Sequence, residues 1–280
     1  MFPPWIYSMC SANPNAATRS ASVWHLSMLA TFGLFLSPSV CGAGDGVATA
    51  QRDPVNIVQQ ADELLRPRFP AIYETTITSF KGAAEVEKGD YRVSVDGKGK
   101  SLLEMLNPAD RGKKILSLPL KGLWMYFPAS QRPIRLTPNQ TLLGQASIGD
   151  VLRGDWASDY AVKGSEPSPC IGSADQHPCL LLRLEAAVEE PTYGRIDLFV
   201  LPDTGIPVGA QLYSLGGKLL KTAQFDPPVT LGGKRFVATV WLSDEVNVRS
   251  ELKTKYVITA AKFTPLSAAV FSVERLSSGL

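Results

Sequence analysis

Beyond residue 70, the chain is a succession of short stretches in which apolar and polar residues alternate or apolar residues run together, separated by glycines and prolines. This pattern predicts about a dozen β-strands joined by turns, which is typical of an antiparallel barrel or a strongly curved antiparallel sheet. The expected strands span residues 72–80, 91–96, 101–106, 114–118, 123–127, 132–136, 160–163, 180–187, 195–201, 208–213, 219–225, 236–242 and 253–263.

One amphipathic helix precedes the predicted strands. Asp53 and Pro54 supply an N-cap and a proline at the first helical position, and Pro67 marks the end of the helix. The apolar residues in between recur at helical spacing and form one stripe, which we expect to pack on the sheet: Ile57, Val58, Ala61, Leu64 and Leu65.

Residues 138–160 interrupt the succession of strands. Their apolar residues are scattered among polar residues and glycines, a pattern too broken for a strand and too apolar for a solvated loop. We therefore expect one or two short helices that fold across the open face of the sheet, for which ordinary core packing is one explanation. A further short helix is expected at residues 265–270. The apolar residues of the stretch at 138–160 are Leu142, Leu143, Ile148, Val151, Leu152 and Trp156.

The first fifty residues differ from the rest of the chain. An almost uncharged extension contains an apolar run at residues 23–36, which matches the apolar region of a signal peptide and is shorter than the roughly 20 residues that span a bilayer. Residues 48–50 (Ala-Thr-Ala) offer a cleavage site, and residues 41–43 offer a second. The sequence thus predicts a leader at residues 1–50, removed on export, and a single domain at residues 51–280. An uncleaved N-terminal anchor is the alternative.

Two cysteines, Cys170 and Cys179, remain after the predicted leader, in a loop rich in proline, glycine and serine. In the oxidising compartment that export implies, they can close a disulfide, for which chain-entropy estimates give about 2.5–3 kcal/mol in so short a loop. A metal site formed by Cys170, His177 and Cys179 is the alternative, although its spacing is irregular and no fourth ligand is visible.

Composition and charge argue against several classes of protein. The formal net charge of the chain is +2, and the leader contains one arginine and one aspartate, so no strongly basic surface for nucleic acid is expected. His177 is the one histidine beyond the leader, which leaves little for a Ser/His/Asp or Cys/His arrangement. Motifs of phosphate-binding loops, serine hydrolases and zinc peptidases do not occur in the sequence. We therefore expect neither an enzyme nor a metal or cofactor.

The stretch at residues 111–136 connects the predicted sheet to a known family. It carries a Gly-x-Trp-x-Tyr-x-Pro pattern at Gly122, Trp124, Tyr126 and Pro128. Short motifs lie at residues 111–113, 122–128, 193–195 and 217–221. Together, and in this order along the chain, they resemble those of outer-membrane lipoprotein-sorting proteins (LolA/LolB-like), which carry acylated proteins across the periplasm. The resemblance covers residues 54–276. It implies a mainly β fold with some α: an open half-barrel of about 11–12 antiparallel strands covered by a few helices.

The resemblance also implies an apolar cavity, under a lid at residues 138–160, that holds acyl chains. The residues expected to line it or to form its lid are Leu103, Met105, Leu116, Leu123, Trp124, Met125, Tyr126, Leu142, Leu143, Ile148 and Trp156. Arg111, Arg132 and Arg135 are expected either on an ordinary solvated face of the sheet or at the mouth of the cavity, facing anionic headgroups or the acidic surface of a partner. Arg92 or Arg183 is expected to hold the lid by bonding its carbonyls.

These expectations favour a periplasmic carrier that holds the acyl chains of lipoproteins or lipids for transfer toward the outer membrane. An inner-membrane transporter and an outer-membrane acceptor are the partners that the resemblance implies. The alternative on the same fold is an envelope sensor or accessory module that binds a lipidated or membrane protein partner. Replacing Leu142 and Leu143 by aspartate should abolish lipid uptake by a carrier and leave partner binding by such a module intact.

Overall fold

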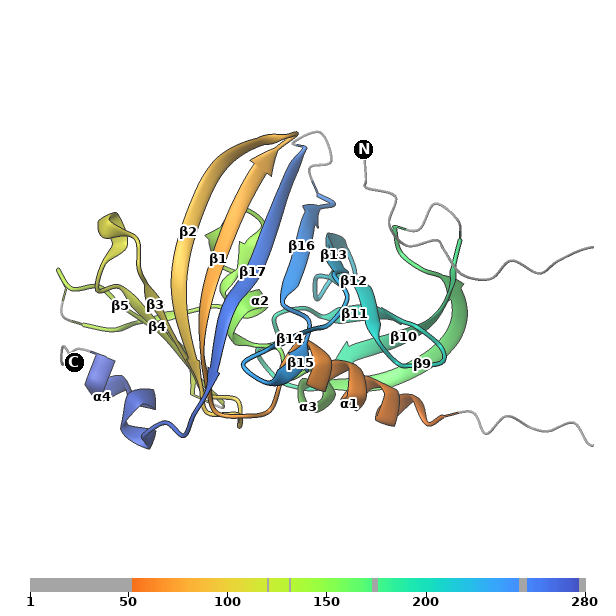
Figure 1. Cartoon of the computed structure of the whole chain (residues 1–280), viewed down its shortest axis with the longest axis horizontal. Helices are drawn as coiled ribbons and strands as arrows, with labels where there is room; N and C mark the ends of the chain where they lie inside the picture. The colour runs from red at the N-terminus through yellow and green to blue at the C-terminus, as the bar shows by residue number, and fades with distance from the viewer. Residues whose placement is uncertain (1–51, 120, 131, 173–175, 247–250, 277–280) are drawn as a thin grey trace, which may run out of the picture. The chain divides into compact units, whose positions relative to one another are not determined.

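The computed structural model describes residues 52–276 except residues 120, 131, 173–175 and 247–250. Its main element is a 13-stranded antiparallel sheet with the strand order β6-β5-β4-β3-β2-β1-β17-β16-β13-β12-β11-β10-β9. Figure 1 shows that this sheet curves strongly and stays open between its two edges. The predicted curved antiparallel sheet is therefore confirmed. The predicted leader lies outside the described residues.

The sheet consists of two runs of consecutive antiparallel strands. The first run comprises β1 (Ala71–Lys81), β2 (Ala84–Val95), β3 (Ser101–Met105), β4 (Lys114–Leu118), β5 (Gly122–Tyr126) and β6 (Ile134–Leu136). The second comprises β9 (Tyr160–Pro169), β10 (Pro178–Ala186), β11 (Arg195–Val200), β12 (Pro207–Tyr213) and β13 (Leu219–Phe225), continued by β16 (Thr239–Asp244) and β17 (Leu252–Phe263). Two separate hairpins are formed by β7 (Thr141–Leu143) with β8 (Ala146–Ser147), and by β14 (Val229–Leu231) with β15 (Lys234–Phe236).

The two edge strands of the sheet, β6 and β9, are joined to each other by residues 137–159. This connection has to pass from one edge of the sheet to the other, and we call it the crossing segment. It contains the β7–β8 hairpin and two short helices, α2 (Ile148–Leu152) and α3 (Trp156–Asp159). The two helices agree with the sequence pattern, and the hairpin is an addition to it.

The first helix, α1 (Pro54–Leu65), begins where Asp53 and Pro54 predict. The Asp53 carboxylate accepts a hydrogen bond from the backbone N–H of Val55, 3.0 Å away, which satisfies one of the unpaired donors of the first turn. The helix buries Ile57, Val58, Ala61 and Asp62, and it packs against α3 and β15 (Figure 1). Within the described ranges, no helix is long and apolar enough to span a membrane.

Apolar side chains on both faces of β3, β4 and β5 are buried or partly buried, in two separate clusters. Leu103, Ile115 and Leu123 point into the main core, on the side of α1 and the crossing segment. Leu102, Leu116 and Leu118 point to the opposite face, where the C-terminal helices η3 (Ala268–Phe271) and α4 (Val273–Leu276) cover them. This double burial explains why these strands are apolar almost without interruption.

The sequence pattern located some strand boundaries imperfectly. Strand β2 begins at Ala84, seven residues before the predicted start, because its first half is exposed and charged. Strand β9 likewise extends through an exposed second half to Pro169. The single strand predicted at residues 236–242 is divided between β15 and β16. Apolar periodicity cannot reveal strand residues with no buried face.

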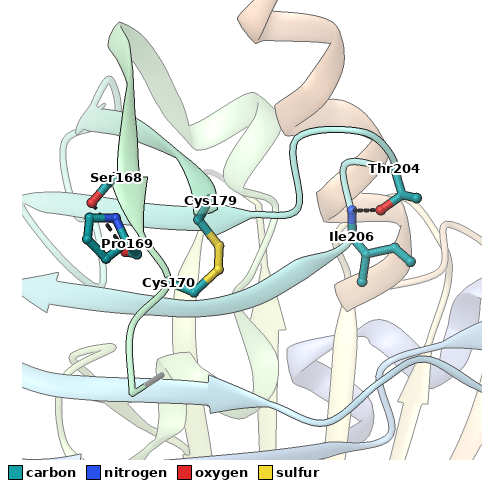
Figure 2. Close-up of a disulfide and its surroundings, with 6 residues drawn as sticks. All are labelled: Ser168, Pro169, Cys170, Cys179, Thr204 and Ile206. Atoms are coloured by element: carbon teal, nitrogen blue, oxygen red, sulfur yellow. Dashed lines mark hydrogen bonds between the residues drawn. A yellow bond between two sulfur atoms is a disulfide. The ribbon is translucent and has the colours of Figure 1, made fainter. Parts of the chain in front are cut away.

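The predicted disulfide between Cys170 and Cys179 is present, with 4.9 Å between the two Cα atoms (Figure 2). It ties the end of β9 to β10, beside a small cluster around Leu181 and Phe199. The pairing excludes the alternative metal site, because disulfide sulfurs are not the thiolates that a metal requires. A disulfide is also typical of exported proteins.

Candidate functional site

A cavity of about 820 Å³ lies among the concave face of the sheet, the end of α1 and the crossing segment. Most of its wall is apolar and comes mainly from six strands, β1, β2, β12, β13, β16 and β17, and from the two short helices. About half of the lining residues that are exposed to solvent are charged, among them Arg68, Lys98, Arg135 and Glu190. The apolar wall consists of Tyr73, Val93, Val95, Val151, Leu152, Trp156, Leu212, Ala223, Phe225, Val237, Val240, Leu242, Tyr256 and Ile258.

Arg66, the residue that ends α1, holds the crossing segment over the cavity. Its guanidinium donates one hydrogen bond to the carbonyl of Val151, 2.8 Å away, and another to the carbonyl of Asp150. Both carbonyls belong to α2, a helix too short to satisfy them itself. Gly154 lies directly against the guanidinium, and a Cβ at this position would come within 1.7 Å of Arg66 Nε. The Ser101 hydroxyl adds a 3.0 Å hydrogen bond to the carbonyl of Leu152.

The start of α2 is fixed to the sheet by a buried ion pair. Asp150 caps the helix together with Ser147, and its carboxylate accepts a 2.8 Å hydrogen bond from the ammonium of Lys221 on β13. The hydroxyl of Tyr193 donates to the same carboxylate. Burial by itself would raise the pKa of Asp150, but the charge and hydrogen bond of Lys221, together with the hydrogen bonds from Tyr193 and the Ser147 backbone, hold this pKa below its ordinary value. The carboxylate is therefore charged at neutral pH and the pair is maintained.

The start of α3 is fixed to α1 through Asp62, a carboxylate on the buried face of α1. Asp62 accepts hydrogen bonds from the backbone N–H groups of Trp156 and Ala157, at 3.2 and 3.4 Å. Arg68 bridges Asp62 at 3.0 Å and Asp155 at 2.6 Å. Burial, and then the negative charge of Asp155, raise the pKa of Asp62 to about 6. The contact thus contains a carboxylate that titrates close to neutral pH.

The period-two geometry of strands separates the predicted lining residues into two sets. Leu103, Met105, Leu123 and Met125 belong to the main core, whereas Leu116, Trp124 and Tyr126 face the C-terminal helices. Leu142, Leu143 and Ile148 pack the crossing segment into the main core. Of the predicted set, Trp156 lines the cavity itself. A role of the other residues in binding a ligand stays a prediction.

The arginines are distributed differently from the expectation. Arg135 lines the cavity and pairs with Glu190 at 3.0 Å, whereas Arg111 and Arg132 are exposed and are not part of the lining. Arg92 pairs with Glu74 on the sheet, and Arg183 pairs with Glu166 on β9. Arg66 performs the carbonyl bonding that the sequence suggested for Arg92 or Arg183.

The sequence analysis missed Arg66, Asp62 and the pair of Asp150 with Lys221. For Asp62 a signal existed, because it follows Val58 by four residues and thus lies within the apolar stripe of α1. A charge in that position indicates a buried partner. The partners of Arg66 are backbone carbonyls some 85 residues away, and no residue type marks them.

The open, curved antiparallel sheet of the chain is shared with solved structures of other proteins. Three of the solved structures that match the chain are the following. A LolA superfamily protein from Nitrosomonas europaea is 25% identical, with a TM-score of 0.67 over 78% of this chain and 96% of the other. A putative outer membrane lipoprotein-sorting protein domain from Vibrio parahaemolyticus is 16% identical, with a TM-score of 0.63 over 80% and 97%. A DUF1329 family protein from Desulfovibrio piger is 20% identical, with a TM-score of 0.63 over 80% and 97%.

The family of the chain follows from a match to a family model. This model, described as "Uncharacterized protein", covers residues 97–278, and the chain belongs to this LolA-like family. None of the curated proteins matches the chain.

Proposed function

We propose that this protein is a periplasmic carrier that holds an acyl chain of a lipoprotein or lipid in the cavity for transfer toward the outer membrane. The observation that carries the proposal is the apolar wall under a segment that Arg66 fastens by hydrogen bonds. The lipoprotein-sorting name of the domain from Vibrio parahaemolyticus and the disulfide support it. An inner-membrane donor and an outer-membrane acceptor are the partners that such transfer needs.

The size and chemistry of the cavity suit an acyl chain. A volume of about 820 Å³ falls within the roughly 300–1,000 Å³ that is common for small-molecule sites. Each methylene group removed from water gains about 0.8 kcal/mol, so a chain of about sixteen carbons gains roughly 13 kcal/mol. This gain is close to what a bilayer offers, and a carrier has to match it without exceeding it by much.

The fastening of the crossing segment suits a site that opens and closes. Arg66 and Ser101 bond to backbone carbonyls of α2, and Asp62 bonds to backbone N–H groups at the start of α3. A few such hydrogen bonds, each contributing about 0.5–1.5 kcal/mol, or more where a charge takes part, can be broken at a moderate cost. Displacement of the segment would expose the apolar wall to an entering chain.

A cavity-filling variant tests the proposal. The full chain is expressed in a secreting host, purified without detergent and examined by native mass spectrometry and solvent extraction. Bound acyl species are expected in the wild-type protein, and Val240→Trp, which places an indole in the cavity, should lose them together with uptake of a fluorescent lipid. Val86→Trp is the matched control, since Val86 is an exposed strand residue outside the cavity.

Two results would contradict the proposal that the protein carries an acyl chain in this cavity. Wild-type protein without bound lipid that also fails to take up the fluorescent lipid would favour the envelope sensor or accessory module. Equal uptake by Val240→Trp and Val86→Trp would place the lipid outside this cavity.

A further inference from the structure

An exposed aromatic ring lies beside the cavity, on the short connection between α1 and β1. The side chain of Phe69 is 46% exposed. Its ring packs edge-on against the ring of Phe263 at the end of β17, with the two centroids 6.3 Å apart, and this contact fixes its position. Residues 67 and 68, which precede Phe69, line the cavity. Phe69 therefore presents an apolar group to solvent next to the lining of the cavity.

Two loops that are distant in sequence meet at Phe69. Gly97, in the turn between β2 and β3, lies so close that a Cβ at this position would come within 2.9 Å of the carbonyl carbon of Phe69. Lys234, on the β14–β15 hairpin, places its ammonium 4.0 Å from the centre of the Phe69 ring. Figure 1 shows the start of β1 and this hairpin at the lower end of the sheet. Three separate segments thus form one surface around the ring.

Three exposed cations accompany the ring on these loops. Lys98 belongs to the turn that contacts Phe69, and it also lines the cavity. Lys234 and Arg235 belong to the β14–β15 hairpin. Among the described residues, none of the three cations has a carboxylate partner. Their charges are therefore available to a partner outside the protein.

Few acidic residues oppose this charge. The two loops, residues 96–100 and 226–236, contain two acidic residues, Asp96 and Asp226. The carboxylate of Asp96 accepts hydrogen bonds from the backbone N–H groups of residues 98 and 100, at 2.7 and 2.9 Å, and is thus turned toward its own loop. A positive excess remains around an exposed apolar ring, a combination that is typical of surfaces that bind to anionic lipid.

We propose that Phe69, Lys98, Lys234 and Arg235 form a docking surface for a bilayer that contains anionic phospholipids. The cations are attracted to the headgroups, and the Phe69 ring enters the boundary between headgroups and acyl chains. Lysine ammonium groups on flexible stems suit a surface whose charges are mobile. Docking brings the rim of the cavity at Lys98 to the lipid surface. This inference goes beyond the proposed function, because binding to a bilayer does not require a lipid in the cavity.

Co-sedimentation with vesicles tests the docking surface. The full chain, purified from a secreting host, is mixed with vesicles of phosphatidylcholine alone or of phosphatidylcholine and phosphatidylglycerol in equal parts. The protein should bind more tightly to the anionic vesicles, and added salt should weaken this binding. Lys98→Gln combined with Lys234→Gln should weaken it by about 25-fold, since each basic residue near an anionic surface contributes about fivefold. Phe69→Ser should weaken it as well, because the inserted apolar ring is lost.

The matched controls lie at the opposite end of the sheet, where β1 ends and the β12–β13 hairpin turns. Lys81→Gln combined with Lys218→Gln removes the same number of positive charges from exposed positions. Leu215→Ser removes an apolar side chain that is 81% exposed. These variants should bind the anionic vesicles as the wild type does, since charges far from the bilayer are screened.

Three results would overturn the docking surface. Equal losses in the two double variants would show attraction by net charge alone. Equal binding to both kinds of vesicle, or binding to neither, would exclude the recognition of anionic lipid. Binding of polyglutamate in place of the anionic vesicles would assign the surface to an acidic protein. The carrier proposal fails separately, because Val240→Trp should lose lipid uptake and still bind the anionic vesicles.

Discussion

The guanidinium of Arg66, at the end of α1, donates a hydrogen bond to the carbonyl of Val151 in α2, 2.8 Å away and 85 residues further along the chain. This contact and the second bond to Asp150 join the first helix to the segment that covers the cavity. The position of the crossing segment therefore depends on Arg66, a residue that lies outside this segment.

Replacing Arg66 by methionine should loosen α2 without unfolding the sheet. The two lost hydrogen bonds involve a charged donor, so their loss should cost about 1.5–3 kcal/mol each at most, and local opening should become at least about tenfold more frequent. Amide hydrogen exchange of residues 148–152 measures this opening. Arg92→Met is the control, since Arg92 pairs with Glu74 at the surface. Unchanged exchange in Arg66→Met would show that Arg66 does not fasten the segment.

Gly154→Ala should have the same effect by a different route. The added Cβ would lie 1.7 Å from Arg66 Nε, so the flexible side chain has to move away from the carbonyls that it binds. Because both substitutions act on one guanidinium, the double variant should show little more exchange than either single variant. Gly164→Ala, where an added Cβ meets nothing within 4 Å, should behave as the wild type does. Additive effects would refute the shared cause.

Asp62 should make the stability of the protein depend on pH between about 4 and 6. Its pKa is raised to about 6 in the folded protein, from 3.8 when unperturbed, so the folded state binds the proton more tightly. The stabilisation from this group is fully present below pH 3.8 and is lost as pH rises through 6, by at most about 3 kcal/mol.

Urea denaturation of the wild type and of Asp62→Asn across this pH range measures the effect. The free energy of unfolding of the wild type, relative to that of the variant, should fall as pH rises. Asp203→Asn, a change in an exposed loop, should keep the wild-type profile. A constant difference between the wild type and Asp62→Asn would contradict the raised pKa.

Removal of the disulfide with the double substitution Cys170→Ala and Cys179→Ala should lower the free energy of unfolding by about 2.5–3 kcal/mol, by the chain-entropy estimate for this short loop. The midpoint of urea denaturation measures the loss. A reducing agent should lower the midpoint of the wild type and have no effect on the double variant. Hydrogen exchange of residues 148–152 should not change, because the disulfide ties β9 to β10 and does not contact the crossing segment.

The sequence predicted the parts of the fold that depend on local patterns. Asp53 and Pro54 mark the start of α1 because capping involves neighbouring residues, and the strands with a buried face follow from apolar periodicity. The cavity lining could not be assigned in the same way. Leu103 and Leu116 are equally apolar and equally buried, yet they lie on opposite faces, because the C-terminal helices form a second core that periodicity does not reveal.

The polar contacts of the site were also beyond local patterns. Lys221 and Asp150 meet across 71 residues, and either one alone resembles an ordinary surface charge in the sequence. Their pairing follows from strand order and helix placement, which become defined only in the folded chain.

The crossing segment spans the open side of the curved sheet and is covalently attached to both edge strands, β6 and β9. Unlike a flap with one hinge, it cannot swing free. If the protein is the proposed carrier, a ligand can enter only when the crossing segment bows outward or the sheet flattens, and the length of the segment limits both movements. For the proposed carrier, the number of residues between β6 and β9 thus limits how large a ligand could be enclosed.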